Sequence, residues 1–181
     1  MRLLLRANAH RQVDGGCREV AAAPDTPRRE PWQWQVRLLA EGHGPTTAPL
    51  PGARRVTEAL PDGALLEVTA DPAAVTARVE VLDPGAGTTV DRAEDDVLVL
   101  VSTGGRLLVE GRHLLADADA MVLAGDDPLH VDVRHPDGPS RDGSVSRDGS
   151  CDDPVSRDGP DARVAVVRLG SARGRTLSWV P

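Results

Sequence analysis

The sequence predicts an all-β protein, built as a sandwich or barrel of short strands. Short apolar or alternating runs recur along most of the chain, and turn signals rich in glycine, proline and aspartate separate them. No window of about twelve or more residues shows a convincing helical period without also containing glycine or proline. Many short strands at this spacing are typical of β-sandwiches and barrels.

The expected strands follow these runs in chain order. Between them, Pro-Asp-Gly at 61–63, Asp-Pro-Gly at 83–85 and Thr-Gly-Gly at 103–105 predict turns, because glycine accepts a positive φ. The strands are expected at residues 2–6, 17–22, 33–40, 55–60, 64–69, 76–83, 96–102, 105–110, 112–116, 119–124, 128–134, 162–169 and 175–180.

The length of 181 residues suits one sizeable domain or two small fused halves. A change of composition around 84–95 favours two similar β halves that together form one unit, residues 1–181. The expected halves are about 1–90 and 91–181.

Charge and hydropathy argue against several partners. The formal net charge is −7 and no arginine stripe follows any expected element, so nucleic acid is not an expected partner. The longest apolar runs, such as Val97–Val101, are far shorter than a membrane span, and the opening MRLLLRANAHR is too short for a signal-peptide core. We expect a soluble cytoplasmic protein without a membrane partner. Whether it forms a homodimer is left open.

The amino-acid alphabet is skewed. Lys, Ile, Phe and Tyr are absent, and all 21 basic residues are arginine. The missing residues have largely AT-rich codons, which suggests a GC-rich genome. Leu, Val and Ala must therefore build the core.

The segment 136–161 contains the tetrapeptide Ser-Arg-Asp-Gly three times and is rich in Asp, Gly, Ser and Pro. It has almost no apolar side chain to bury, so we expect a mobile, expanded hairpin loop. A calcium loop is the sharper alternative, but the spacing fits no EF-hand. Its candidate ligands would be Asp148, Asp152, Asp153 and Asp158. The two cysteines, Cys17 and Cys151, lie far apart and do not suggest a disulfide.

Two stretches carry a resemblance to a known family. They are RQVDGGCREVAAAP at 11–24 and WQWQVRLLAEGHGPTTAPLPGARRV at 32–56. In order and spacing they resemble the HutD/Ves family of small bicupin proteins. That family has a Trp-Lys-Asn-Gly-Gly-Gly segment before Thr-Arg-Glu, then a Trp-Arg-Leu-Ser strand, Gly-Pro-Phe-Ser, Phe-Pro-Gly and a characteristic arginine. The matching residues are Gly15-Gly16, Arg18-Glu19, Trp34, Gly44–Thr47, Leu50–Gly52 and Arg55.

The sequence departs from the family pattern at several positions. The tryptophan and lysine of the first motif are missing, Asp14 stands where asparagine is usual, and both phenylalanines of the second motif are replaced. The resemblance covers residues 2–69 in detail and is only architectural beyond them. It implies a cupin-like (RmlC-type) bicupin with two packed β halves.

The resemblance also implies a function. It points to a non-catalytic small-molecule binder that modulates histidine utilisation and needs no cofactor. The implied ligand is a small anionic carboxylate from histidine breakdown, such as urocanate or formylglutamate.

The candidate ligand-binding residues come from these motifs. Arg55 would offer its planar guanidinium to a carboxylate; because adjacent strand residues face opposite ways, Arg54 cannot share that role. An ion pair of Arg55 with Glu58 or Glu19 is the structural alternative. Glu19 would either orient Arg55 or contact the ligand. The structural alternative is that Glu19 is a solvated charge at the end of its strand. The further candidates are Gly15, Gly16, Arg18 and Thr47; for the glycines, a simple bend is the commoner explanation.

Metal binding is not expected, because the His-x-His with a downstream Glu that is usual in cupins is absent. His113, His130 and His135 are scattered, and the last two would fall on opposite faces of a continuous strand.

Two alternatives to a binder remain open. A metal-free isomerase or epimerase would need His10, His43 or Glu19 as its acid or base. A ligand-free scaffold would make protein contacts through the 136–161 loop.

Overall fold

The computed structural model describes residues 2–14, 16–22, 33–44, 52–136, 162–174 and 177. The predicted all-β class is confirmed, because every regular element within these residues is a strand apart from one 3-10 turn, η1 (Ala7–Ala9). The strands are β1 (Arg2–Leu5), β2 (Arg11–Asp14), β3 (Cys17–Ala22), β4 (Trp34–Leu39), β5 (Arg54–Ala59), β6 (Leu65–Ala70), β7 (Val75–Leu82), β8 (Thr88–Asp91), β9 (Val97–Thr103), β10 (Leu107–Val109), β11 (His113–Leu115), β12 (Ala120–Leu123), β13 (His130–Arg134) and β14 (Arg163–Ser171).

Two of these strands were not expected from the sequence. β2 lies at the edge of its sheet and reads Arg-Gln-Val-Asp. With only one apolar residue, it gives no apolar pattern by which a strand could be recognised. β8 reads Thr-Thr-Val-Asp and falls inside the change of composition around 84–95. The strand expected at 175–180 lies outside the described residues apart from Leu177. The predicted loop at 136–161, with its candidate calcium ligands and Cys151, also lies outside them apart from Pro136.

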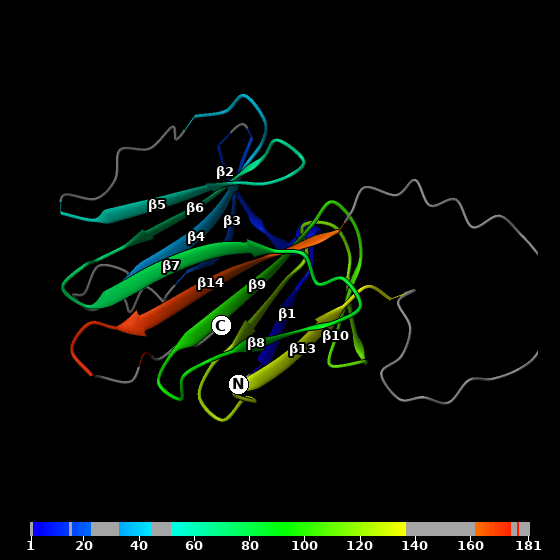
Figure 1. Ribbon diagram of the computed structural model, residues 1–181. Coiled ribbons are helices and arrows are strands. Elements are labelled where there is room, and N and C mark those ends of the chain that lie inside the picture. The colour runs from blue at the N-terminus through cyan, green and yellow to red at the C-terminus, as the bar shows by residue number, and fades with distance from the viewer. Residues whose placement is uncertain are drawn as a thin grey trace, which may run out of the picture.

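The strands form three antiparallel sheets (Figure 1). We call β1-β12-β9-β14-β7 the central sheet, β2-β3-β4-β6-β5 the first outer sheet, and β11-β10-β13-β8 the second outer sheet. The central sheet packs on both of its faces, because its residues belong to two separate core clusters. The first cluster lies against the first outer sheet and the second lies against the second outer sheet.

β9 shows how one strand serves both cores. Val97, Val99 and Val101 belong to the first core cluster, whereas Leu98 and Leu100 belong to the second. Successive strand side chains point to opposite faces, so an uninterrupted apolar run is what a strand covered on both faces requires. All seven residues of β9 are buried.

The sheets are built across the boundary expected near residue 90. β1 pairs with β12, β7 with β14 and β8 with β13, so strands from the first half of the chain lie beside strands from the second. The division into halves at about 1–90 and 91–181 therefore stays a prediction.

The three turn signals are turns with glycine in the left-handed region. Gly63 has φ 82°, Gly85 has φ 48° and Gly104 has φ 74°. In two of them an aspartate side chain closes the bend: Asp83 Oδ1 accepts a hydrogen bond from the Gly85 N–H at 2.9 Å, and Asp62 Oδ1 does so from the Ala64 N–H at 3.1 Å.

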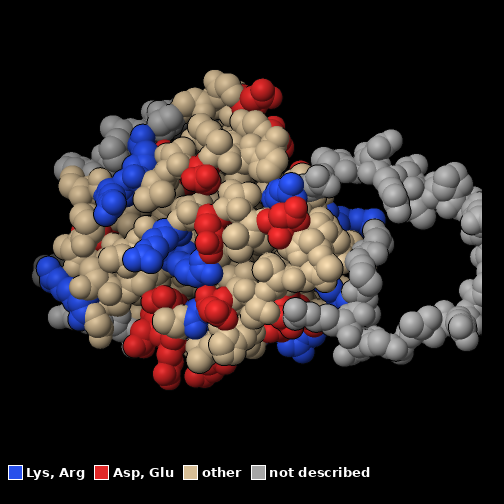
Figure 2. All heavy atoms as spheres, in the orientation of Figure 1, with Lys and Arg blue, Asp and Glu red and all other residues tan. Residues whose placement is uncertain are grey.

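Acidic and basic side chains are interspersed on the face of the molecule in Figure 2. Among the described residues, several acidic and basic side chains form ion pairs. Arg163 Nη1 lies 2.6 Å from Asp83 Oδ2, and Arg168 forms an ion pair with Glu80. Individual carboxylates such as those of Asp83 and Glu80 are thus neutralised locally by an arginine.

Candidate functional site

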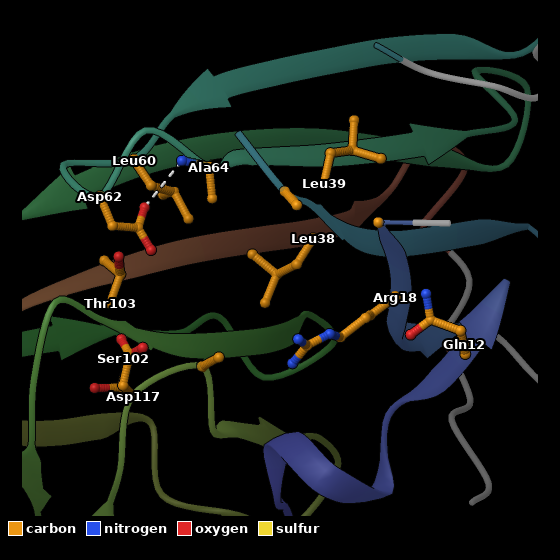
Figure 3. Close-up of a pocket in the computed structure, with 13 residues that line it drawn as sticks. Gln12, Arg18, Leu38, Leu39, Leu60, Asp62, Ala64, Ser102, Thr103 and Asp117 are labelled. Carbon is orange, nitrogen blue, oxygen red and sulfur yellow. Dashed lines mark hydrogen bonds between the residues drawn. The ribbon is translucent and has the colours of Figure 1, made fainter. Parts of the chain in front are cut away.

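A pocket of about 320 Å³ lies between the central sheet and the first outer sheet (Figure 3). It is lined by the β2–β3 hairpin, the end of β4, the turn between β5 and β6, the end of β9, and the turn between β11 and β12. Leu38, Leu60 and Ala118 give it apolar walls. Its volume is at the lower end of the range for small-molecule sites.

Arg18 supplies the positive charge of this pocket. It stands on β3 opposite Leu38 of β4, and Leu38 belongs to the first core cluster, so both side chains face the central sheet. Figure 3 shows the Arg18 guanidinium reaching beneath Leu38 into the pocket. Within the described residues, its side chain has no ion pair or hydrogen bond. Its planar N–H donors are therefore available to a carboxylate.

Two carboxylates lie across the pocket from Arg18. Asp62 comes from the β5–β6 turn, where its Oδ1 accepts the Ala64 N–H. Asp117 comes from the β11–β12 turn, where its Oδ1 accepts the Gly104 N–H at 2.8 Å. Each bond orients its carboxylate and engages only Oδ1, so Oδ2 is the oxygen that a ligand would meet.

Thr103 adds a buried hydroxyl between these carboxylates. The residue is 2% exposed and lines the pocket, and among the described residues its Oγ1 has no hydrogen-bond partner. Its neighbour Ser102 is satisfied, because its hydroxyl donates to the Gly105 carbonyl at 2.9 Å. A buried hydroxyl without a partner is costly unless a ligand or water completes it.

Asp119 holds the turn that presents Asp117 and Ala118 to the pocket. Its carboxylate accepts the Ala116 N–H at 2.9 Å and the Ala7 N–H at 2.8 Å, and Arg6 Nη1 lies 2.6 Å from its Oδ2. Burial raises the pKa of Asp119, but these three partners outweigh burial and hold the pKa below its ordinary 3.8.

Ala118 is one of two non-glycine residues with a positive φ in the described chain, at 60°. Such a conformation is strained for a residue with a Cβ, and strain of this kind often accompanies functional sites.

Gly16 lies at the β2–β3 bend beside Arg18. Its φ is 95°, and a Cβ added to it would lie 2.8 Å from the imidazole ring of His43. Its carbonyl accepts the Ala40 N–H at 2.8 Å. The glycine is thus required by backbone conformation, as the simpler interpretation of this motif expects.

Replacement of Gly16 by alanine is expected to lower the free energy of unfolding by about 1–2 kcal/mol, since the backbone must hold a positive φ with a Cβ. The exposed His43 ring can move aside, so the clash adds little. Urea denaturation of the two proteins would measure the difference. Gly111→Ala is the matched control, because its φ is 65° but nothing lies within 4 Å of its Cβ position. A loss at Gly16 much larger than at Gly111 would show that His43 cannot move.

Arg55 lies on the face of the first outer sheet that points away from the pocket. It stands across from Thr69 on β6, one residue beyond Val68, which belongs to the first core cluster. Arg55 Nε is 3.0 Å from Glu67 Oε2, and Arg37 Nη1 is 3.8 Å from Glu67 Oε1. Glu67 is 1% exposed, so two arginines converge on one buried carboxylate. The Arg55 charge is engaged by Glu67, which the sequence had not singled out.

Glu19 also points away from the pocket, since it follows Arg18 on β3. Its partners are Arg11, whose Nε lies 3.1 Å from Glu19 Oε1, and Gln35, whose side-chain amide donates to Glu19. A bulge then follows between Glu19 and Ala21, which lets Val20 and Ala21 both join the first core cluster.

The structure thus separates the predicted site residues. Arg18 and Gly16 line the pocket, whereas Arg55 and Glu19 lie on the other face of the sheet. Gly15 and Thr47 lie outside the described residues. The sequence had recognised Asp62 and Thr103 only as parts of turn signals, and had not singled out Asp117.

The three candidate acids or bases do not line the pocket. His10 is half-buried; burial, and then the positive charge of Arg18, lower its pKa below the ordinary 6.5. His43 is exposed, with Nδ1 at 3.2 Å from the Glu41 carbonyl.

Across the described ranges, no three His, Cys, Asp or Glu side chains gather in a way that could hold a metal ion. In the same ranges, no helix has the length and apolar character needed to cross a membrane.

Stacked antiparallel sheets, two apolar cores and a small pocket between two sheets define a cupin-like β protein. The chain shares this fold with solved structures that it covers almost completely. A conserved protein of unknown function from Pseudomonas aeruginosa PAO1 matches with a TM-score of 0.63 and 16% identity, over 94% of this chain and 99% of that one. HutD from Pseudomonas fluorescens SBW25 matches with a TM-score of 0.57 and 13% identity, over 94% of this chain and 99% of that one.

A bacterial pirin from Escherichia coli, solved in complex with nickel(II), matches with a TM-score of 0.52 and 10% identity, over 93% of this chain and 98% of that one. No family model matches the sequence, and no curated protein matches it. The resemblance to HutD expected from the sequence is confirmed at the level of the fold.

Proposed function

We propose that this protein is a HutD-like small-molecule binder that holds a carboxylate ligand in the pocket beside Arg18. The observation that carries the proposal is a guanidinium that faces a pocket of about 320 Å³ and has no ion pair within the described residues. Urocanate and formylglutamate are the ligands to test first, and binding either would limit its accumulation and so modulate histidine utilisation.

The assignment of the ligand carboxylate to Arg18 rather than Arg55 rests on charge. Glu67 already opposes Arg55, whereas Arg18 reaches apolar walls and open pocket volume. A charge-assisted, bidentate contact with a carboxylate contributes more than a neutral hydrogen bond. Arg55 as a ligand residue remains the competing prediction.

Calorimetric titration with urocanate and with formylglutamate tests the proposal. We expect Arg18→Gln to weaken binding by about ten- to a hundredfold, the effect of losing a hydrogen bond to a charged group. We expect Arg55→Gln and the exposed control Arg106→Gln to bind within about threefold of the unsubstituted protein.

The outcomes separate the alternatives. Loss of binding in Arg55→Gln but not in Arg18→Gln would move the site to the other face of the sheet. No heat with either ligand, measured at several temperatures, would contradict the binder and favour the ligand-free scaffold.

A further inference from the structure

We propose that the pocket is bipolar and selects a ligand with a carboxylate at one end and an ammonium or N–H donor at the other. This inference rests on the proposed function, because Arg18 must hold the carboxylate. It adds a requirement at the opposite end of the pocket, where Asp62, Thr103 and Asp117 lie.

These three side chains come from three separate segments and gather on one side of the pocket. Figure 3 shows Asp62, Thr103 and Asp117 grouped together, with Leu38 and the Arg18 guanidinium beside them. Asp62 and Asp117 are each oriented by a backbone N–H, from Ala64 and Gly104. Such preorganised acceptors bind a donor without first having to be ordered.

The charges on the lining decide which ligands fit. Asp62 and Asp117 oppose the single Arg18, so the lining carries one net negative charge. A dicarboxylate such as formylglutamate would place its second negative charge against Asp62 and Asp117 and be repelled. Of the two ligands proposed above, this inference therefore favours urocanate, which has a single carboxylate and an imidazole N–H. A ligand with one carboxylate and one ammonium or N–H donor would meet the opposite charge at both ends.

Thr103 supplies an independent indication of a polar ligand. Its hydroxyl is buried at 2% residue exposure, yet Oγ1 has no partner among the described residues. A hydroxyl can accept from an ammonium or N–H group while donating to a neighbouring acceptor. An apolar ligand end would leave this hydroxyl unsatisfied, which is unfavourable in a buried site.

Three probes with one chain length test the selectivity: pentanoate, 5-aminopentanoate and hexanedioate. Each has a carboxylate attached to a chain of four carbons. In pentanoate that chain ends in a methyl group, in 5-aminopentanoate it carries a terminal ammonium, and in hexanedioate it carries a second carboxylate. The affinity of each probe is measured by competition against the ligand that binds in the first titration, or by direct titration if neither of those ligands binds. We expect 5-aminopentanoate to bind about tenfold more tightly than pentanoate. We expect hexanedioate to bind most weakly.

The matched variants are Asp117→Asn and Asp62→Asn. An asparagine keeps the oxygen that accepts the backbone N–H, so each turn is retained while the negative charge is removed. Each variant should reduce the preference for 5-aminopentanoate over pentanoate at least threefold and leave pentanoate binding within about twofold. Exposed Asp126→Asn, in the β12–β13 turn, should change nothing.

Equal affinities for pentanoate and 5-aminopentanoate, with both still dependent on Arg18, would overturn the bipolar pocket and leave the proposed function standing. A preference that persists unchanged in both aspartate variants would also overturn it. Absence of binding by every probe and by the ligands of the first titration would overturn the proposed function and this inference together.

Discussion

Replacement of Arg92 by methionine is expected to lower the free energy of unfolding by about 3–5 kcal/mol. Arg92 follows β8, is 4% exposed, and donates only to backbone carbonyls. Nη1 donates to Ala93, Glu94 and Asp96 at 2.8–3.1 Å, and Nη2 donates to Gly125 at 2.8 Å and to Asp127 at 2.6 Å. Methionine has a similar apolar stem but no donors, so five carbonyls would lose their partner at once.

The arginine joins two turns that are distant in the sequence. It ties the segment before β9 to the turn between β12 and β13, and β9 and β12 are neighbours in the central sheet. Lysine could not replace it, because an ammonium has three donors from one atom and cannot span both groups of carbonyls.

Thermal and urea denaturation would measure the loss at Arg92. The control is Arg112→Met, since the Arg112 side chain is 66% exposed and its ion pair with Glu110 should contribute little. A difference of less than about 1 kcal/mol between the two variants would show that water replaces the Arg92 donors without cost.

Replacement of Asp119 by asparagine is expected to cost about 2–3 kcal/mol at neutral pH. The Asp119 carboxylate accepts two backbone N–H groups with different oxygens, whereas asparagine would turn an NH₂ group toward one of them. Arg6 contributes less than the backbone bonds, because its side chain is 51% exposed and its charge is screened by solvent.

The effect at Asp119 should depend on pH in a defined direction. The pKa of Asp119 is lowered in the folded protein, so the folded state binds this proton less readily than the unfolded chain does. The stabilisation is therefore fully present well above the ordinary pKa of 3.8 and is lost as the pH falls through the lower folded pKa. The stability gap between the unsubstituted protein and Asp119→Asn should narrow in acid.

Denaturation curves recorded from pH 7 to pH 3 would test this, with exposed Asp126→Asn as the control. A gap that stays constant over this range would contradict the assigned role of the charge. Because Asp119 holds the turn that carries Asp117, we also expect Asp119→Asn to weaken ligand binding, although Asp119 does not line the pocket.

Strand positions were readable from the sequence because the signals are local. Alternation in Arg54–Ala59 and the apolar run in Val97–Thr103 each occupy one strand, and the intervening turns carry glycines that the structure places at positive φ. The edge strand β2 was missed for the same reason, since Arg11, Gln12 and Asp14 offer no apolar pattern.

The candidate site was only partly readable. The motif resemblance pointed to Arg18 and Gly16, which line the pocket, but it gave most weight to Arg55. Strand alternation predicts that the side chains of Arg18 and Glu19 point to opposite faces of their sheet. It does not predict which of these two faces packs against another sheet. Glu67 pairs with Arg55 only because β5 and β6 lie in register, a relation that depends on how the two strands pair.

By itself, the sequence determined the all-β class, most strand positions, the turn glycines and the resemblance to HutD, since each depends on neighbouring residues or on motif order. Only the tertiary structure decided that a central sheet is covered on both faces and that strands on either side of residue 90 pair. It also brought Arg18 to the same pocket as Asp62, Thr103 and Asp117. The physical reason is that long-range strand pairing and burial select one face of each strand, and residues far apart in sequence meet only after that selection.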